Sequence, residues 1–280
     1  MLAHFLDFFY FTDPNVRWVA LGAVLICATT GGVGVFVCLQ KRSLVGDTIA
    51  HAMLPGVAVA FLLTGTKQNF ALSLGAIISG GFAWAIINYL IKNTKLKSDT
   101  VLALVLSVFY GFGVMLLTYI QQKQSGQQAG LDKFLFGKIA STTLDDLLPL
   151  SVLLSIVVLV ILAGYQQLKI IIFDVEYAKA HGYGVVFWET LLALLVIAVV
   201  ATGIQAVGVI LLASLLITPA LVARYWTTSL WAMLLLASLV GAFSGLLGAY
   251  ISYLSPKMPT GPWIVIVLSV LAFASVWRRK

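Results

Sequence analysis

Two side chains that commonly bind metal ions, Asp47 and His51, lie four residues apart in the segment 46–51. Residues at this spacing on an α-helix project from one face, so both side chains would point the same way. A carboxylate oxygen together with an imidazole nitrogen suits borderline divalent ions such as Mn²⁺, Fe²⁺ and Zn²⁺. One pair does not close a coordination sphere, whereas two copies of it around a symmetric pore would supply four ligands.

The same two residues also have a structural interpretation. Asp47 follows Arg42 by five residues, so it lies near the start of its apolar run, where a carboxylate can cap a helix. His51 lies one turn deeper and is too far along for a cap, but it could hydrogen-bond a neighbouring carbonyl. Ionisable groups in hydrocarbon cost several kcal/mol and usually face a cavity or a ligand. Spacing alone supports the two interpretations equally.

The surrounding sequence predicts an all-α polytopic membrane protein. Of its 280 residues, 61% are hydrophobic and 10% are charged, and the mean hydropathy is +1.05. Apolar runs of about 20 residues are long enough to cross the hydrocarbon core of a bilayer, and lipid offers no hydrogen-bond partners, so the runs must be helical. We expect one transmembrane domain over 1–280 with nine candidate spans, roughly 17–39, 43–64, 69–91, 99–120, 146–168, 186–202, 206–226, 229–251 and 261–278.

The seventh of these spans is the least regular. Gly203, Gly208 and Pro219 are placed where they could break it into half-helices. Eight spans plus a re-entrant segment is therefore the alternative to nine.

The positive charges orient the expected spans. Most lysines and arginines lie between apolar runs, so the net charge of +7 indicates membrane orientation and not a nucleic-acid partner. With nine spans and the N-terminus outside, eleven of these 17 residues lie on the cytoplasmic side and six on the outer side. The reverse orientation would invert this bias. We therefore expect a multi-pass protein of the cell membrane with an outer N-terminus and a cytoplasmic C-terminus.

Two connections are longer than simple turns. The extracytoplasmic loop 121–145 is rich in glutamine and also contains Leu131, Phe134, Leu135 and Phe136, which suggests a short interfacial helix or a docking surface. In the cytoplasmic segment 174–182, Asp174 can cap a short helix and Gly182 can end it. Such a helix is either a contact for a cytoplasmic partner or an ordinary loop helix, and spacing does not separate these.

Small residues recur at every fourth position in the eighth span, at Ala237, Gly241, Gly245 and Ala249. This pattern permits close approach of another helix. We favour a neighbour in the same chain over a second protomer.

Several separated segments resemble one family, the manganese, zinc and iron permeases of the ABC-3 group. Residues 41–56, which include the Gly-Asp-x-x-x-His pattern, carry the most specific likeness. The segment 173–182 resembles the coupling helix of the family, 207–220 its late-span motif, and 259–262 the element before its last helix. The resemblance extends from about residue 16 to 278, which is nearly the whole chain.

The resemblance implies a homodimeric, type II ABC importer-like permease in membrane lipid, with two copies of an ATPase subunit and an extracytoplasmic metal-binding protein as partners. It implies that Asp47 and His51 line the path of the transported ion. The donors Asp and His admit Mn²⁺, Zn²⁺ and Fe²⁺ alike, and we favour Mn²⁺. The resemblance also assigns coupling to the ATPase to the segment 174–182. The residues expected to take part in that coupling are Asp174, Glu176, Tyr177, Ala178 and Gly182.

The chain itself is not expected to be an enzyme or to hold a cofactor of its own. No Gly-x-x-x-x-Gly-Lys-Ser/Thr loop occurs in the sequence, so ATP would be bound by the partner subunit. The main rival is an ion-coupled secondary transporter in which Asp47 and His51 relay protons, although the sequence holds no second copy of the Gly-Asp-x-x-x-His pattern. A membrane scaffold or receptor would need a folded soluble domain, and the longest polar stretch is only about 25 residues.

Overall fold

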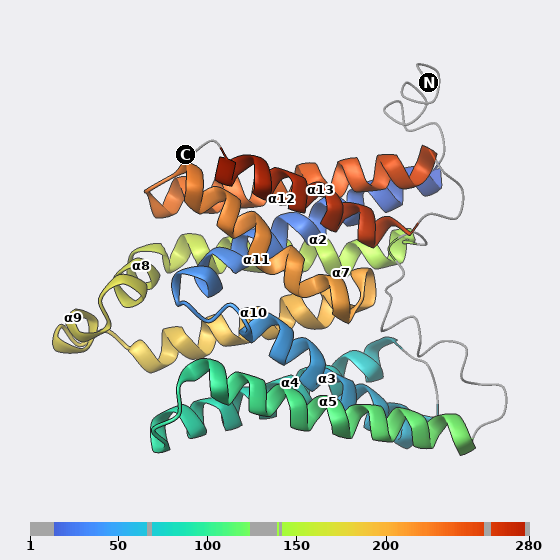
Figure 1. The fold of residues 1–280 in the computed structure, drawn as a ribbon, viewed down its shortest axis with the longest axis horizontal. Helices are drawn as coiled ribbons and strands as arrows, with labels where there is room; N and C mark the ends of the chain where they lie inside the picture. Colours follow the sequence, from blue (N-terminus) through green and yellow to red (C-terminus); the bar gives the residue numbers. More distant parts are fainter. Residues whose placement is uncertain (1–13, 66–68, 124–138, 140–141, 255–258, 278–280) are drawn as a thin grey trace. The chain divides into compact units, whose positions relative to one another are not determined.

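The structure is a computed structural model that describes residues 14–65, 69–123, 139, 142–254 and 259–277. Within these ranges all regular secondary structure is helical and there is no strand, which confirms the expected fold class (Figure 1). Eight of the described helices are long and apolar enough to cross a membrane. These are α2 (Pro14–Leu39), α3 (Val45–Thr64), α4 (Asn69–Asn93), α5 (Ser98–Lys123), α7 (Leu144–Ala163), α10 (Val185–Val207), α12 (Leu230–Leu254) and α13 (Thr260–Trp277).

The uncertain seventh span corresponds to α11 (Val209–Trp226), which is a shorter apolar helix. The break in this region falls at Gly208, which separates α10 from α11 and has a φ of 92°. Glycine tolerates this left-handed conformation because it has no Cβ. Gly203 lies inside α10 and Pro219 inside α11, so neither of them divides a helix.

The chain forms two compact units, and the first comprises Met1–Gln40, Lys138–Thr190 and Ser214–Lys280. Besides α2, α7, α12 and α13, it contains the short helices α8 (Tyr165–Phe173) and α9 (Val175–Ala180). In this unit α12 packs along α2 through the stripe of small residues (Figure 1). A Cβ on Gly245 would lie 2.6 Å from the carbonyl oxygen of Ala23, and one on Gly241 would overlap the carbonyl oxygen of Cys27. The stripe therefore packs within the chain, as expected.

Aromatic contacts gather several helix ends at one end of the first unit. The indole Nε1–H of Trp226, at the end of α11, donates to the hydroxyl of Ser275 near the end of α13 over 3.0 Å. Tyr165, at the start of α8, packs edge-on against Trp231 near the start of α12, with ring centroids 5.8 Å apart. The C-terminal ends of α7, α11 and α13 therefore lie beside the N-terminal end of α12.

The second unit comprises Lys41–Gly137 and Leu191–Ala213, and α3 is its central helix. Gly56 on α3 meets Gly75 on α4 backbone to backbone, since a Cβ on either would overlap the carbonyl oxygen of the other. On the α5 side, a Cβ on Gly113 would lie 2.9 Å from the Cβ of Leu54. Glycine on each neighbouring helix thus lets α3 approach both closely.

Side-chain hydroxyls also hold α3 in place. The hydroxyl of Ser79 on α4 donates to the carbonyl oxygen of Ala52 over 2.6 Å. The hydroxyl of Thr48 donates to the carbonyl oxygen of Leu44 in its own helix and lies 3.4 Å from the carbonyl oxygen of Leu102 on α5. Pro55 lies inside the helix, a position that membrane helices tolerate because neighbouring helices and hydroxyl groups satisfy freed backbone groups.

Candidate metal site

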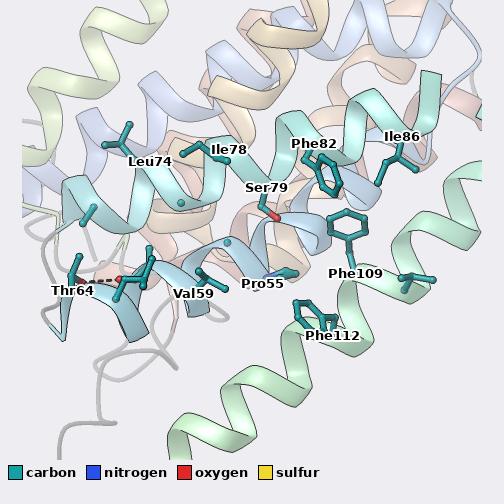
Figure 2. A pocket seen from close by; sticks show the side chains of 16 residues that line it. Pro55, Val59, Thr64, Leu74, Ile78, Ser79, Phe82, Ile86, Phe109 and Phe112 are labelled. Atoms are coloured by element: carbon teal, nitrogen blue, oxygen red, sulfur yellow. Dashed lines mark hydrogen bonds between the residues drawn. The ribbon is translucent and has the colours of Figure 1, made fainter. Parts of the chain in front are cut away.

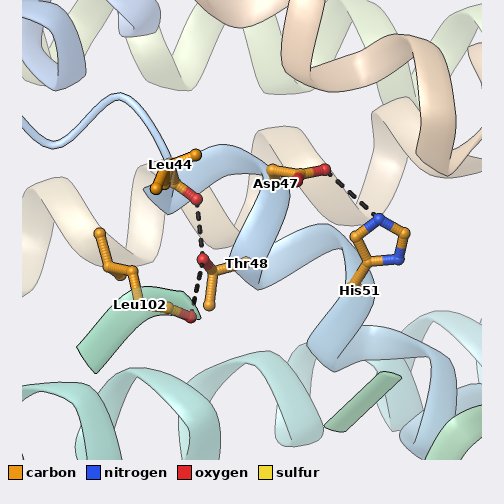
Figure 3. A network of polar contacts seen from close by, with 5 residues as sticks. All are labelled: Leu44, Asp47, Thr48, His51 and Leu102. Carbon is orange, nitrogen blue, oxygen red and sulfur yellow. Dashed lines mark hydrogen bonds and ion pairs between the residues drawn. The ribbon is translucent and has the colours of Figure 1, made fainter. Parts of the chain in front are cut away.

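Asp47 and His51 lie on α3 and face one another across one helical turn. The Nε2 atom of His51 is 3.4 Å from the Oδ1 atom of Asp47. Both side chains are half-buried, with 19% of His51 and 32% of Asp47 exposed. Figure 3 shows the two side chains projecting together from α3, whereas Thr48 points toward Leu102. The predicted helical placement of the pair on one face is thus found in the structure.

The separation of the two atoms suits a bridging ion. At 3.4 Å the contact is longer than a good hydrogen bond. An ion placed about 2.1 Å from both atoms would span this gap with an oxygen–metal–nitrogen angle of about 110°, close to the tetrahedral value. The pair is therefore arranged so that one divalent ion could bind both side chains without a large movement of either.

The surroundings of His51 are unusual for a histidine in a helix. Its other ring nitrogen, Nδ1, is buried and has no hydrogen-bond partner in the described part of the chain. The ring instead packs edge-on against Tyr110 of α5, with ring centroids 4.8 Å apart and planes inclined by 76°. The sequence did not predict the role of Tyr110, because His51 and Tyr110 are 59 positions apart and no local pattern indicates that two such distant residues are in contact.

The structural interpretation of the pair receives limited support. Leu44, not Asp47, occupies the N-cap of α3, and it makes no side-chain capping bond. Asp47 lies in the first turn, where a carboxylate interacts favourably with the helix dipole. His51 does not bond a neighbouring carbonyl among the described residues, since Nδ1 lacks a partner and Nε2 faces Asp47.

The pair is incomplete as a coordination sphere. Nowhere in the described ranges do three or more His, Cys, Asp or Glu side chains converge to hold an ion. Structural and catalytic transition-metal sites use at least three protein ligands. No third His, Cys, Asp or Glu side chain of the described residues would therefore complete the site.

An apolar groove of about 740 Å³ lies on the same unit, between α3, α4 and α5 (Figure 2). Phe82 and Phe109 lie across it with ring centroids 6.2 Å apart. Its two hydroxyl groups are both engaged, because Ser79 donates to Ala52 and Thr64 donates to the carbonyl oxygen of Ala60. The groove offers no ionisable side chain, so the candidate ion ligands remain Asp47 and His51.

The segment predicted to couple to an ATPase forms the short helix α9, which has six residues. Asp174 is its N-cap and accepts the backbone N–H of Tyr177 over 2.9 Å. Gly182 follows the helix with a φ of 73°. Glu176 is exposed and pairs with Lys179 over 3.1 Å. The capping and ending roles predicted from the sequence are both present.

The other two features of α9 concern Tyr177 and Ala178. Tyr177 is half-exposed, and its ring stacks on that of His181 with centroids 3.9 Å apart. Ala178, in contrast, is fully buried in an apolar cluster with Ile171 and Val185. The predicted coupling residues thus divide into an exposed set and one buried residue that anchors the helix.

One further prediction falls outside the described residues. Positions 124–138 and 140–141 of the loop 121–145 are among those not described, and they include Leu131, Phe134, Leu135 and Phe136. The expectation of an interfacial helix or docking surface there stays a prediction.

Comparison with known proteins shows that the chain is similar to membrane proteins of bacterial metal transport systems. The chain is 41% identical to the manganese transport system membrane protein MntC of Bacillus subtilis over 94% of its own length, but it spans only 60% of that relative. It is 39% identical to the zinc transport system membrane protein TroC of Treponema pallidum, over 96% of this chain and 95% of TroC.

Solved structures agree with this relationship. A chain of PsaBC from Streptococcus pneumoniae in complex with Fab matches with a TM-score of 0.84 and 34% identity, over 98% of this chain and 95% of that one. An inward-facing putative metal-chelate type ABC transporter shares the fold, with a TM-score of 0.71 and 20% identity over 94% of this chain and 86% of that one. The sequence model of the ABC 3 transport family matches residues 12–279. The chain is therefore a multi-pass membrane subunit that belongs to the ABC 3 transport family.

Proposed function

We propose that this chain is the permease subunit of an ATP-driven importer of divalent transition-metal ions. The observation that carries the proposal is the Asp47–His51 pair, whose 3.4 Å separation suits one bridging ion. Membership of a transport family supports the general role. A permeation site must admit an ion and also release it, and an incomplete pair of oxygen and nitrogen donors meets that need better than a closed cage of thiolates.

The incomplete pair also supports a homodimer. One chain contributes two ligands, and no further His, Cys, Asp or Glu joins them in the described residues. A second copy across a two-fold axis would bring another Asp47 and another His51 to the same pore. Closed two-fold symmetry is the commonest arrangement of soluble oligomers, and it repeats each contact on both subunits. The ion path is therefore proposed to run between two copies of α3.

The donor set admits manganese, zinc and iron, and manganese is the ion we favour. Oxygen donors suit Mn²⁺ well, whereas imidazole is shared by all three metals. Relatives named for manganese and for zinc transport lie at similar identity, 41% and 39%. Selection among these ions is proposed to depend partly on the binding protein that delivers them.

The described helix ends support a cytoplasmic C-terminus and an outer N-terminus. Lys169, Lys179 and Arg224 lie on α8, on α9 and in the last turn of α11, at the end of the first unit where α13 also ends. Positive residues favour the cytoplasmic side. The first half of α2 lies toward the opposite end, since a Cβ on Gly22 would be 3.0 Å from Thr142, just before α7 begins. Under this orientation α11 returns toward the cytoplasm.

The partners are proposed to bind at the two opposite ends. On the cytoplasmic side α9 offers Glu176 and Tyr177 to an ATPase subunit, while buried Ala178 holds the helix against its own chain. Each of two permease copies would bind one ATPase, and ATP would be bound and hydrolysed there. On the outer side, a metal-binding protein would dock near the loop 121–145 and the segment around Lys257, both largely outside the described residues.

The test uses substitutions that remove one ligand at a time. Asp47→Ala and His51→Ala should abolish Mn²⁺ uptake while the subunit still accumulates in the membrane, because each change removes a ligand from both copies of the site. Asp99→Ala is the matched control, since Asp99 also lies in the first turn of a helix of the same unit but has no histidine one turn later. Uptake is measured by metal analysis and normalised to the amount of subunit.

Two outcomes would contradict the proposal. Wild-type uptake in both alanine variants would remove the ligand role of the pair. Uptake by liposomes that continues without internal ATP, and stops when the proton gradient is collapsed, would instead favour the ion-coupled secondary transporter.

A further inference from the structure

His51 lacks the contact that normally orients a metal-binding histidine. Such a ring almost always donates its second N–H to a carbonyl oxygen or a carboxylate, which fixes the ring plane and the tautomer. Here Nδ1 is buried without any hydrogen-bond partner in the described ranges. The ring plane of His51 is therefore not fixed by a hydrogen bond at Nδ1.

The aromatic ring of Tyr110 packs against the imidazole of His51. Its centroid lies 4.8 Å from the centroid of the imidazole, and the planes are inclined by 76°. Edge-to-face pairs between about 4.5 and 7 Å are a favoured geometry, because the positive edge of one ring meets the negative face of the other. Rotation of His51 about its Cβ–Cγ bond would break this contact, so Tyr110 restricts the plane of the imidazole.

The position of Tyr110 is itself fixed from both sides. Earlier along α5, the carbonyl oxygen of Leu102 lies 3.4 Å from the hydroxyl of Thr48, one turn before His51. Later along α5, Gly113 packs against Leu54, three residues after His51. The register of α5 on α3 is thus set on either side of the ring pair, and Tyr110 cannot slide away from His51 without breaking a close contact.

A purely structural role explains Tyr110 poorly. Its side chain is 43% exposed, so it is not a core residue of the second unit. Phe112, two residues later on α5, is exposed to a similar extent at 49% and lines the apolar groove instead of the ion pair. The two aromatic residues therefore differ chiefly in whether they touch His51.

We infer that Tyr110 is a positioning residue of the ion site, which holds the imidazole of His51 so that Nε2 and the Asp47 carboxylate can bind one ion together. The inference rests on the proposed function, since it assigns a role within the same site. Tyr110 does not bind the ion. By restricting the imidazole of His51 before the ion binds, Tyr110 reduces the conformational entropy that this ring loses on binding. Removal of Tyr110 therefore weakens ion binding more than it slows transport at saturation.

The experiment measures Mn²⁺ uptake by the full permease complex in liposomes with ATP and the metal-binding protein supplied. Tyr110→Leu removes the ring plane and should raise the half-saturating Mn²⁺ concentration about tenfold, in the range seen when partners of metal ligands are removed. The maximal rate should change little. Tyr110→Phe keeps the ring and should behave as the wild type. Phe112→Leu is the matched control and should leave the half-saturating concentration unchanged.

The outcomes separate this inference from the proposed function. An unchanged half-saturating concentration in Tyr110→Leu, or an equal rise in Phe112→Leu, would overturn the positioning role while leaving ion transport intact. Uptake that does not depend on Asp47 would overturn the proposed function itself. If the leucine variant does not accumulate in the membrane, Tyr110→Met replaces it, because methionine also lacks a ring plane. An unchanged half-saturating concentration in Tyr110→Met, or an equal rise in Phe112→Leu, would then overturn the positioning role.

Discussion

Two helix contacts of this protein, α2 with α12 and α3 with α5, use their polar groups in opposite ways. Between α2 and α12, glycines bring the backbones together and the hydroxyl of Thr30 bonds carbonyl oxygens of its own helix. Neither helix carries a carboxylate or an imidazole. Between α3 and α5, Thr48 reaches across to Leu102 and Tyr110 meets His51. The α2–α12 contact thus joins two helices by close backbone packing, whereas the α3–α5 contact also positions the side chains of the candidate metal site.

The largest effect is expected from a change to the α2–α12 contact. Gly241→Leu should prevent accumulation of the folded subunit, because even a Cβ at this position would overlap the carbonyl oxygen of Cys27. Gly81→Leu on α4 is the matched control, since a Cβ there would meet nothing within 4 Å. The amount of monodisperse protein extracted from membranes measures the difference. Equal yields from the two variants would show that close backbone approach does not stabilise this contact.

A smaller effect is expected from lowering the pH, which should weaken Mn²⁺ binding at the Asp47–His51 pair of α3. Metal ligation needs a neutral imidazole, so protons compete with the ion for His51. Occupancy by Mn²⁺ should therefore fall as the pH is lowered. The α2–α12 contact has no carboxylate or imidazole, so the same acidification should leave it in place. Metal bound per complex and the elution volume report the two contacts separately, and flat metal binding would count against His51 as a ligand.

The smallest effect compares two threonines. Thr48→Val removes a hydroxyl that lies against a second helix, and hydrogen bonds between membrane helices contribute about 0.6 kcal/mol on average. Thr30→Val removes a hydroxyl that bonds only within α2, so it should lower the melting temperature less. Thermal melting in detergent checks the order of the two shifts. A larger shift for Thr30→Val would mean that the cross-helix contact of Thr48 adds no stability.

Much of the helical layout is readable from the sequence, because it depends on local patterns. Apolar runs predict the long helices, and the spacing of Asp47 and His51 predicts that they share a face. Asp174 and Gly182 mark a short helix because one supplies an oxygen for capping and the other adopts a positive φ. Each of these features is decided by residues only a few positions apart.

Contacts between helices are not readable in the same way. The meeting of His51 with Tyr110 depends on how α5 sits along α3, which Thr48 and Gly113 set in three dimensions. The location of the helix break at Gly208 was likewise ambiguous, since Gly203 and Pro219 have the same local preference for breaking a helix. Packing decides which of several permitted breaks is used, and a pattern in one sequence does not report packing.

Pro55 gives α3 a mechanical property that the static contacts do not express. Proline has no N–H, so the carbonyl oxygen of His51, four residues earlier, loses its usual donor within the helix. A helix that lacks one such bond flexes most readily at that point. Beyond it, Gly56 is clamped against Gly75 of α4. The turn that bears both ion ligands is therefore joined to the part of α3 held against α4 by one backbone hydrogen bond fewer than an unbroken helix would have.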